Sequence, residues 1–283
     1  MNSLLDCYTL SNGVKIPCVG FGTFLTPEDE VKESVKAALQ AGYRHIDAAA
    51  IYGNEKGVGE ALKNAGVARE EIFVTSKVWN AERGYEKTKA AFQKTLDDLG
   101  LEYLDLYLIH WPANRRQFGE GAAALNAQTW RAMEDLYLEG KIKAIGVSNF
   151  WPHHLEELMK TARIKPMVNQ IEYHPGWMQE AVVAYCEVHG ILVEAWSPLG
   201  RSNVLKHETL KEIAAAYGKS PAQICVRWEM QHGVLPLPKS VTPSRIAENA
   251  DVFGFELTAE DMLKIDTIHD CGIHYELPDD VDF

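Results

Sequence analysis

The chain has 283 residues, 46% of them hydrophobic and 24% charged, and its 28 Lys and Arg against 40 Asp and Glu give a net charge of −12 at pH 7. This composition is that of a soluble globular protein and excludes a disordered chain, while the acidic balance argues against nucleic acid or an anionic membrane surface as partner. The chain has no run of eighteen apolar residues, so no membrane span is predicted. Its length fits either two modest domains or one α/β barrel of about 250 residues.

The cysteines and the first residues indicate a cellular compartment. Five cysteines are scattered along the chain and form no CxxC pair, which favours a reducing environment over a disulfide or zinc framework. The opening MNSLLDCYTLSNG has neither a basic stretch nor a long apolar core, so no secretory signal is expected. We therefore expect a cytoplasmic protein, and we expect it to be a monomer.

In chain order, short apolar runs alternate with amphipathic segments. A hairpin is predicted over 8–19, with Asn12 and Gly13 at its turn. Segments of helical period then separate the apolar runs; 130–137 and 155–162 are two of them. The eight β-rich runs are 19–24, 45–49, 72–79, 104–111, 142–149, 167–173, 191–199 and 234–240.

Several helix starts carry a hydroxyl residue followed by proline. Ser220, Pro221 and Gln223 combine an N-cap hydroxyl, a proline at the first helical position and a Gln that can return to the cap. The cap-plus-proline signal recurs at Thr26-Pro27 and at Thr242-Pro243.

The eightfold alternation of strand and helix predicts the fold. Runs that are apolar on both faces favour a parallel sheet closed into a (β/α)8 TIM barrel, with an N-terminal hairpin and extra C-terminal helices. An open doubly wound sheet is the alternative, but it would carry a glycine fingerprint after its first strand. Here Gly20 and Gly22 are followed by Thr23, Phe24 and Leu25, without a third glycine. No linker or repeat divides the chain, so we predict one domain over 1–283.

Polar residues gather at the ends of three consecutive strands, where the chemistry of such barrels lies. Asp47 lies near the end of the second run, Lys77 near the end of the third and His110 near the end of the fourth, while Tyr52 lies in the loop after Asp47. Each residue alone also fits a structural role, such as a helix cap or a solvated strand end. Together they are suited to protonating an oxygen. An ammonium lowers the pKa of a neighbouring phenol, a carboxylate keeps the ammonium charged, and a neutral imidazole can orient a carbonyl group.

Three stretches resemble the signatures of the aldo-keto reductase family, in the family's order. They are GYRHIDAA (42–49) followed by YGNE (52–55), KIKAIGVSNF (141–150), and LPKSVT (237–242) followed by Arg245, Glu248 and Asn249. Two positions depart from the common pattern. Ala48 stands where many members have Thr. Trp196 stands where animal members usually have Tyr, and Trp at this position is similar to prokaryotic-type members.

The resemblance implies NADPH-dependent reduction of aldehydes and ketones without a metal. By position it makes Tyr52 the general acid, Lys77 and Asp47 the pair that lowers its pKa, and His110 the residue that orients the substrate. Ser148, Asn149 and Gln170 match the residues that hold the nicotinamide carboxamide, and Trp196 matches the one that stacks on the ring. The other residues expected at the cofactor are Gly22, Thr23, Asp47, Ser197, Leu199, Lys239, Ser240, Val241, Thr242, Arg245, Glu248 and Asn249.

The segment after the eighth run predicts a phosphate site from its own residues. Lys239, Ser240 and Arg245 flank the helix start at Thr242-Pro243, where backbone N–H groups favour an anion. A solvated basic turn is the alternative, but it does not explain a basic cluster in so acidic a chain. We predict that this cluster binds the 2′-phosphate of NADPH, and the resemblance places Glu248 and Asn249 at the adenine.

An apolar substrate cleft is expected beside the catalytic residues. Phe24, Trp79 and Trp111 lie in strand-to-helix loops beside Tyr52 and His110, and Phe118 is a further candidate. The long Gly- and Ala-rich loop over 112–126 favours mobility. Its Arg115 and Arg116 fit either an anionic substrate or a solvated pair. The tail over 274–283 resembles the family's short C-terminal loop near the substrate, although its aspartates also fit a solubilising role.

His153 and His154 are adjacent rather than spaced as metal ligands on one helix face, so no metal site is predicted. The leading hypothesis is a reductase of small aldehydes, dicarbonyls or keto-sugars. One alternative is an NADP-binding regulatory or structural protein on the same fold, but nothing appended to the barrel supports it. The other is a cofactor-free hydrolase that uses Glu172 and Glu194 as paired carboxylates, which leaves the nucleotide-binding motif unexplained.

Overall fold

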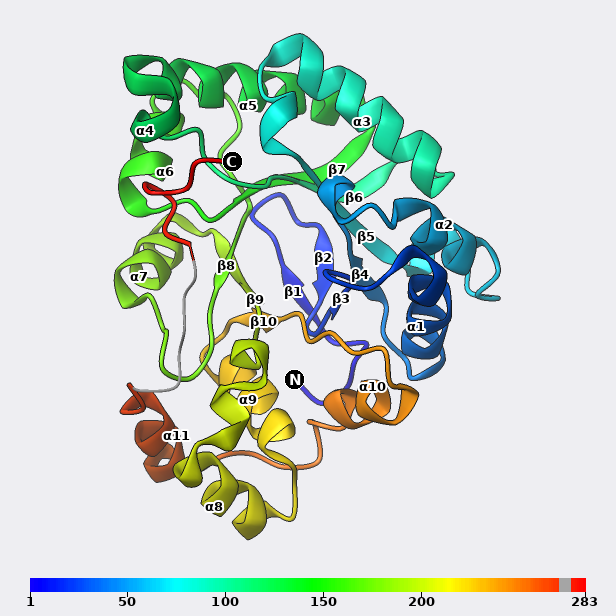
Figure 1. Cartoon of the computed structure of the whole chain (residues 1–283), viewed down its shortest axis with the longest axis vertical. Coiled ribbons are helices and arrows are strands. Elements are labelled where there is room, and N and C mark those ends of the chain that lie inside the picture. The colour runs from blue at the N-terminus through cyan, green and yellow to red at the C-terminus, as the bar shows by residue number, and fades with distance from the viewer. Residues whose placement is uncertain (270–275) are drawn as a thin grey trace.

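The structure, a computed structural model, describes residues 1–269 and 276–283. At its centre is a sheet of eight parallel strands, each paired with the next along the chain. Helices surround the strands on the outside (Figure 1). Each predicted apolar run contains one strand. In order these are β3 (Phe21–Gly22), β4 (His45–Asp47), β5 (Phe73–Val78), β6 (Leu104–Ile109), β7 (Ile142–Ser148), β8 (Val168–Glu172), β9 (Leu192–Trp196) and β10 (Leu235–Pro236).

Backbone hydrogen bonds join the first and last strands of this sheet. The N–H of Gly20 donates to the carbonyl of Pro236 (3.0 Å), and the N–H of Gly22 donates to the carbonyl of Pro238 (3.1 Å). A Cβ at Gly20 would lie 2.4 Å from Leu237 Cδ2 and 2.7 Å from His45 Nδ1, so a larger residue here would displace these buried side chains. The predicted (β/α)8 barrel is therefore confirmed, and the open sheet is excluded.

The predicted N-terminal hairpin is also present. Strand β1 (Cys7–Thr9) pairs antiparallel with β2 (Lys15–Pro17). Gly13 adopts φ +87° at the turn, a conformation that glycine reaches at little cost. In Figure 1 the hairpin lies across the middle of the ring of strands.

The helices follow the predicted alternation, but only one of three predicted hydroxyl caps forms. Ser220 and Gln223 make the reciprocal capping bonds. Thr242 occupies the N-cap position without a side-chain cap bond, and Pro27, not Thr26, is the N-cap of the first helix. The helices are α1 (Glu28–Gln40), α2 (Glu55–Lys63), α3 (Tyr85–Leu99), α4 (Arg115–Phe118), α5 (Ala122–Leu138), α6 (Pro152–Met159), α7 (Glu180–His189), α8 (Glu208–Tyr217), α9 (Pro221–Gln231), α10 (Pro243–Ala250) and α11 (Ala259–Asp266).

The segment over 112–126, expected to be a long loop, is largely helical, and its mobility stays a prediction. The segment contains the short helix α4 and the start of α5. Asn114 caps α4 by accepting the N–H of Gln117, and its Nδ2 donates to the carbonyls of Pro278 (2.9 Å) and Val281 (2.8 Å). The segment is thus anchored to the C-terminal tail, a contact that no local sequence pattern announces. No helix in the described part of the chain is both long enough and apolar enough to cross a membrane.

Candidate active site

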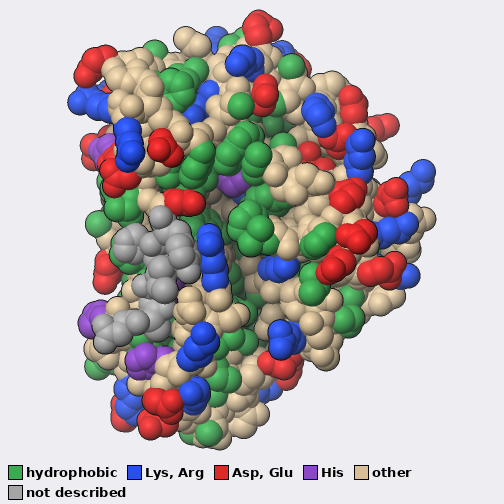
Figure 2. Space-filling view, viewed as in Figure 1, with side chains coloured by type: hydrophobic (Ala, Val, Ile, Leu, Met, Phe, Trp, Pro, Cys, Tyr) green, Lys and Arg blue, Asp and Glu red, His purple; other side chains and the backbone are tan. Residues whose placement is uncertain are grey.

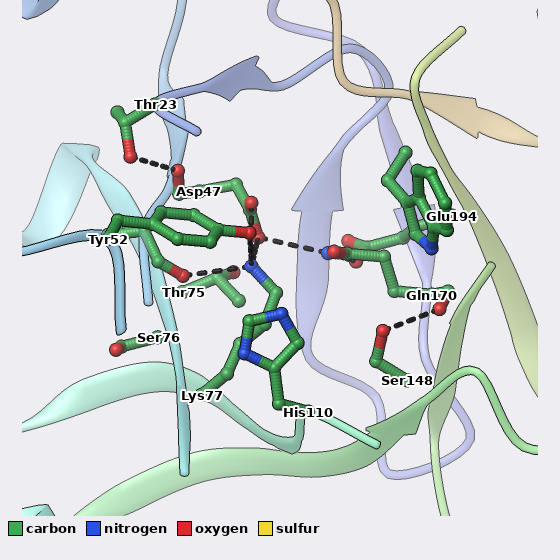
Figure 3. A network of polar contacts seen from close by, with 12 residues as sticks. Thr23, Asp47, Tyr52, Thr75, Ser76, Lys77, His110, Ser148, Gln170 and Glu194 are labelled. Atoms are coloured by element: carbon green, nitrogen blue, oxygen red, sulfur yellow. Dashed lines mark hydrogen bonds and ion pairs between the residues drawn. The ribbon is translucent and has the colours of Figure 1, made fainter. Parts of the chain in front are cut away.

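Lys77 is the centre of a buried polar cluster at the carboxyl ends of β4 and β5 (Figure 3). Its Nζ donates to both carboxylate oxygens of Asp47 (2.9 and 2.8 Å), to the carbonyl of Ala48 (2.9 Å) and to the hydroxyl of Tyr52 (3.3 Å). The strand register causes this meeting, because Asp47 pairs with Thr75 and Lys77 lies two residues further on the same face. Tyr52 ends the 3-10 turn η1 (Ala50–Tyr52) that follows β4.

The acid strength of Tyr52 departs from the expectation. Burial raises the pKa of Tyr52, the charge of Lys77 lowers it and the charge of Asp47 raises it again, so the pKa is raised overall. Lys77 therefore acts in the predicted direction, but burial outweighs it. Burial lowers the pKa of Lys77, but Asp47 and Tyr52 more than offset that effect, so the ammonium remains charged. The phenol thus holds its proton at neutral pH beside a fixed positive charge.

His110 faces Tyr52 from the end of β6. The two rings lie 5.7 Å apart with an interplanar angle of 77°. Burial, followed by the charges of Lys77 and Arg83, holds the pKa of His110 well below its usual range, so the imidazole is neutral. Its Nδ1 is buried without a hydrogen-bond partner among the described residues, which leaves Nε2 as the nitrogen that can meet a ligand. Arg83, which the sequence analysis missed, also donates to the carbonyl of Trp111 (3.1 Å).

A hydrogen-bond network joins the four residues expected at the nicotinamide. Ser148 Oγ donates to the carbonyl of Gln170 (2.7 Å), and Asn149 Nδ2 donates to the carbonyl of His110 (3.0 Å). Trp196 Nε1 donates to Asn149 Oδ1 (2.8 Å). The tryptophan at this position therefore supplies a hydrogen bond as well as an aromatic face.

Tyr52, His110 and the four residues expected at the nicotinamide line one cavity of about 590 Å³, a volume typical of small-molecule sites. Figure 2 shows the hollow near the middle of this face, with a histidine and hydrophobic side chains at its upper end and Lys or Arg side chains beside its lower part. The predicted residues on its wall are Gly22, Phe24, Asp47, Tyr52, Trp79, His110, Trp111, Ser148, Asn149, Gln170, Trp196, Ser197, Leu199, Lys239, Ser240, Val241, Thr242 and Arg245. Those that the sequence missed are Leu25, Ile51, Pro198, Arg201, Ser202 and Leu237, while Glu276 and Phe283 belong to the tail that the resemblance placed near the substrate.

Unusual backbone conformations concentrate around the cavity. Within the described ranges, six residues other than glycine have φ between +48° and +69°, and all of them except Gln179 are on the cavity wall. Such residues are uncommon and tend to cluster at ligand sites. The five on the wall are Leu25, Asn149, Ser197, Arg201 and Ser202.

The basic end of the cavity is formed by the loop before α10, which contains Lys239. The Nζ of Lys239 donates to the carbonyl of Leu25 (3.2 Å), so this loop meets the one after β3 across the cavity. Arg245 lies in the first turns of α10, beside the helix N-terminus. Glu248 and Asn249 do not line the cavity, and their role at the adenine remains a prediction. Thr23 was expected on the wall, but its side chain is buried behind it and donates to the carbonyl of Asp47 (2.9 Å).

Aromatic side chains form the opposite end. Phe283 stacks on Trp79 at 5.6 Å with an interplanar angle of 16°, and it makes a T-shaped contact with Trp111. The tail thus reaches the predicted substrate cleft, as the resemblance implied, although residues 274 and 275 lie outside the described part. Phe118, the further candidate, is not on the cavity wall, and the Arg83 guanidinium covers its ring.

The two adjacent histidines have a third partner that their spacing did not reveal. His153 Nε2 and His154 Nε2 lie 3.1 and 3.0 Å from Asp279 Oδ1, forming a group of three side chains that could hold a metal ion. However, His154 Nδ1 accepts the N–H of Trp151 (3.2 Å), so Nε2 carries the proton and donates to the carboxylate. That protonation state does not bind a metal, and the absence of a metal stays a prediction.

The carboxylates of the hydrolase alternative do not meet a common cavity. Glu172 and Glu194 are both buried and neither is on the cavity wall. Glu172 contacts His174 (3.3 Å), whereas Glu194 contacts Gln170 inside the barrel. The arrangement gives no place for a substrate between them.

Comparison with known proteins agrees with this geometry. The sequence over residues 18–270 matches the Aldo/keto reductase family. The chain is 55% identical over 268 residues to the glyoxal reductase of Bacillus subtilis (strain 168), which covers 94% of both chains. It is similar in structure to an aldo-keto reductase enzyme from a Medee basin deep-sea metagenome library (TM-score 0.92, 45% identity, 98% of this chain and 100% of that one). It also resembles a Bombyx mori aldo-keto reductase in complex with NADP (TM-score 0.85, 37% identity, 94% and 92%).

Proposed function

The chain belongs to the aldo/keto reductase family, and from this premise we propose that it is an enzyme that reduces aldehydes and ketones to alcohols with NADPH. The observation that carries this proposal is the contact of Lys77 with both Asp47 and the hydroxyl of Tyr52, on the wall of a cavity that has one basic and one aromatic end. Such a cavity suits a phosphorylated cofactor and a carbonyl compound side by side.

The residues of this chain fit NADPH. Lys239 and Arg245 at the N-terminus of α10 offer charge and N–H groups to the 2′-phosphate. For the nicotinamide, Gln170 and Trp196 offer an amide and an aromatic face on the wall of the same cavity as Tyr52. When bound there, NADPH supplies the hydride that the carbonyl carbon accepts.

The protein's own groups handle the proton and the geometry. Tyr52 donates its phenolic proton to the carbonyl oxygen as negative charge develops on it, and later recovers a proton from solvent. Lys77 stabilises the phenolate that remains, while Asp47 keeps the ammonium in place. His110, neutral and with Nε2 free, orients the carbonyl oxygen toward Tyr52. The overall reaction consumes one carbonyl group, one NADPH and one proton, and yields an alcohol and NADP+.

Small aldehydes, dicarbonyls and keto-sugars are the proposed substrates. The 55% identity to the glyoxal reductase of Bacillus subtilis is our reason to favour small dicarbonyls within this group as substrates of this protein. Phe24, Trp79, Trp111 and Phe283 give the substrate end of the cavity an apolar wall. We further propose that the protein acts in the cytoplasm, because its cysteines are scattered and form no CxxC pair, and that it acts as a monomer.

A panel of carbonyl compounds tests this function. Each compound is mixed with NADPH and protein, and consumption is followed at the NADPH absorbance band. We expect oxidation of NADPH that matches the alcohol formed, with NADH a poorer donor. Tight binding of NADPH with no multiple turnover on any compound would instead support a regulatory or structural protein.

A further inference from the structure

The barrel interior beneath the cavity holds a second buried acid that the proposed reaction does not use. Glu194 of β9 is fully buried. It is the register partner of Gln170 on β8. The Nε2 of Gln170 donates both to Glu194 Oε2 (2.9 Å) and to Asp47 Oδ1 (2.9 Å), so one amide connects the two acids (Figure 3).

These two bonds fix the orientation of the Gln170 amide. Its NH2 group has two hydrogens, and one faces each acid. Rotation of the amide by 180° would turn its oxygen toward the anionic Asp47 and lose that donation. The Oε1 of Gln170 has no hydrogen bond to any described residue, and Gln170 is on the cavity wall. The network therefore presents an acceptor, and not a donor, to a ligand in the cavity.

The surroundings of Glu194 disfavour its charged form. Burial raises the pKa of Glu194 to about 8, and the charge of Asp47 acts in the same direction, against the Gln170 hydrogen bond and Lys77. Glu194 Oε1 lacks a hydrogen-bond partner among the described residues. His45 Nε2 lies 3.9 Å away, but burial and Lys77 lower the pKa of His45 to about 3, so it brings no positive charge. Lys77, the one cation among the described residues that acts on Glu194, is already paired with Asp47.

We propose that Glu194 is a positioning residue. Its neutral carboxyl holds the Gln170 amide with Oε1 toward the nicotinamide carboxamide, and leaves Asp47 and Lys77 as the charged pair beneath Tyr52. The inference rests on the proposed function, and it adds a residue to which that function assigns no role. Ionisation of Glu194 would add a negative charge to the cluster, and the phenol of Tyr52 would then hold its proton more strongly. Carbonyl reduction therefore slows as pH rises through the titration of Glu194.

Two substitutions separate this role from a general structural one. Glu194→Gln keeps the shape and an acceptor for Gln170 but cannot ionise, so the single-turnover rate of NADPH oxidation at pH 7 stays within about twofold of wild type. The decline in rate that we expect for wild type around pH 8 should be absent in Glu194→Gln or displaced to higher pH. Glu194→Leu removes the acceptor, and we expect a rate about tenfold lower together with weaker binding of NADPH, because the Gln170 amide is then held by Asp47 alone. Glu229→Gln is the matched control, because Glu229 is fully buried but outside this network, and its pH profile should equal that of wild type.

Either of two results would overturn the proposal. One is a Glu194→Gln profile with the same alkaline decline as wild type. The other is a folded Glu194→Leu protein with a wild-type rate at pH 7; if that variant does not fold, the Glu194→Gln profile decides. Failure of the proposed function is a different observation, namely that wild-type protein oxidises no NADPH at any pH.

Discussion

The Nζ of Lys77 lies 2.9 and 2.8 Å from the two carboxylate oxygens of Asp47, and both side chains are buried in the barrel. A buried ion pair of this kind is costly to break, because removal of one partner leaves an uncompensated charge. The pair also fixes a positive charge beside the hydroxyl of Tyr52, 3.3 Å away. The same contact therefore links the stability of the protein to the proposed chemistry.

Lys77→Met should affect both properties. We expect the free energy of unfolding to fall by about 3–5 kcal/mol, since Asp47 remains as an unpaired buried charge. The double variant Lys77→Met/Asp47→Asn should recover most of this loss, yet both proteins should reduce aldehydes at least about 100-fold more slowly than wild type. Urea denaturation and the NADPH assay give the two readouts. Recovery of activity in the double variant would mean that Lys77 matters only for stability.

Arg245→Ala tests the phosphate end of the cavity. The substitution removes a charge-assisted contact with the 2′-phosphate, so NADPH binding should weaken by roughly 1.5–3 kcal/mol while NADH binding changes little. Fluorescence titration with each cofactor measures this. Arg131→Ala is the control, because Arg131 is an exposed residue of α5 paired with Asp135. Equal losses for NADPH and NADH in Arg245→Ala would remove the 2′-phosphate assignment.

Phe283→Ala tests the aromatic end. The ring of Phe283 stacks on Trp79 and contacts Trp111, and its loss should raise KM for apolar aldehydes several-fold, equivalent to about 1 kcal/mol. The Kd for NADPH should not change, because the phosphate end is untouched. Phe255→Ala, which removes a ring outside the cavity, should leave KM as in wild type. An unchanged KM in Phe283→Ala would place the substrate elsewhere.

Glu55 predicts a pH dependence of stability. Burial raises the pKa of Glu55 from its ordinary value to about 7, against hydrogen bonds from Ser76 and Thr95 that lower it. Because the folded protein holds this proton more strongly than the unfolded chain, the stabilisation is complete below about pH 4.5 and is lost as pH rises from there through about 7. In denaturation experiments, the free energy of unfolding of wild type should be lower at pH 8 than at pH 4.5 by an extra amount on the order of 2 kcal/mol due to Glu55. Glu55→Gln should remove this contribution. Parallel curves for the two proteins would contradict the raised pKa.

Much of the fold could be predicted because its signals are local. Apolar runs and helical stripes gave the order of strands and helices, and the fixed polarity of a parallel barrel placed Asp47, Lys77 and His110 at one rim. Thr26 misled because a hydroxyl before proline satisfies the cap pattern whether or not the side chain turns toward the helix. The segment over 112–126 was expected as a loop because its Gly and Ala content hides the helices there, and the bonds of Asn114 to the distant tail have no local signal.

The rest of the site depends on contacts between distant segments. The resemblance placed the tail near the substrate, but no residue pattern indicated that Phe283 would stack on Trp79. The bonds between Gln170, Glu194 and Asp47 depend on strand register inside the closed barrel, which apolar patterning does not specify. The direction of the pKa of Tyr52 depends on the depth of burial, and residue types alone indicated only the opposing effect of Lys77.

The central claim is that Tyr52 donates the proton in carbonyl reduction, and Tyr52→Phe tests it most directly. The substitution keeps the ring that packs between Phe24 and His110 and removes only the hydroxyl. We predict that kcat with a small dicarbonyl falls by about 10²–10⁴-fold, while the Kd for NADPH and the thermal midpoint stay close to those of wild type. Ordinary turnover by a folded Tyr52→Phe protein would contradict the account.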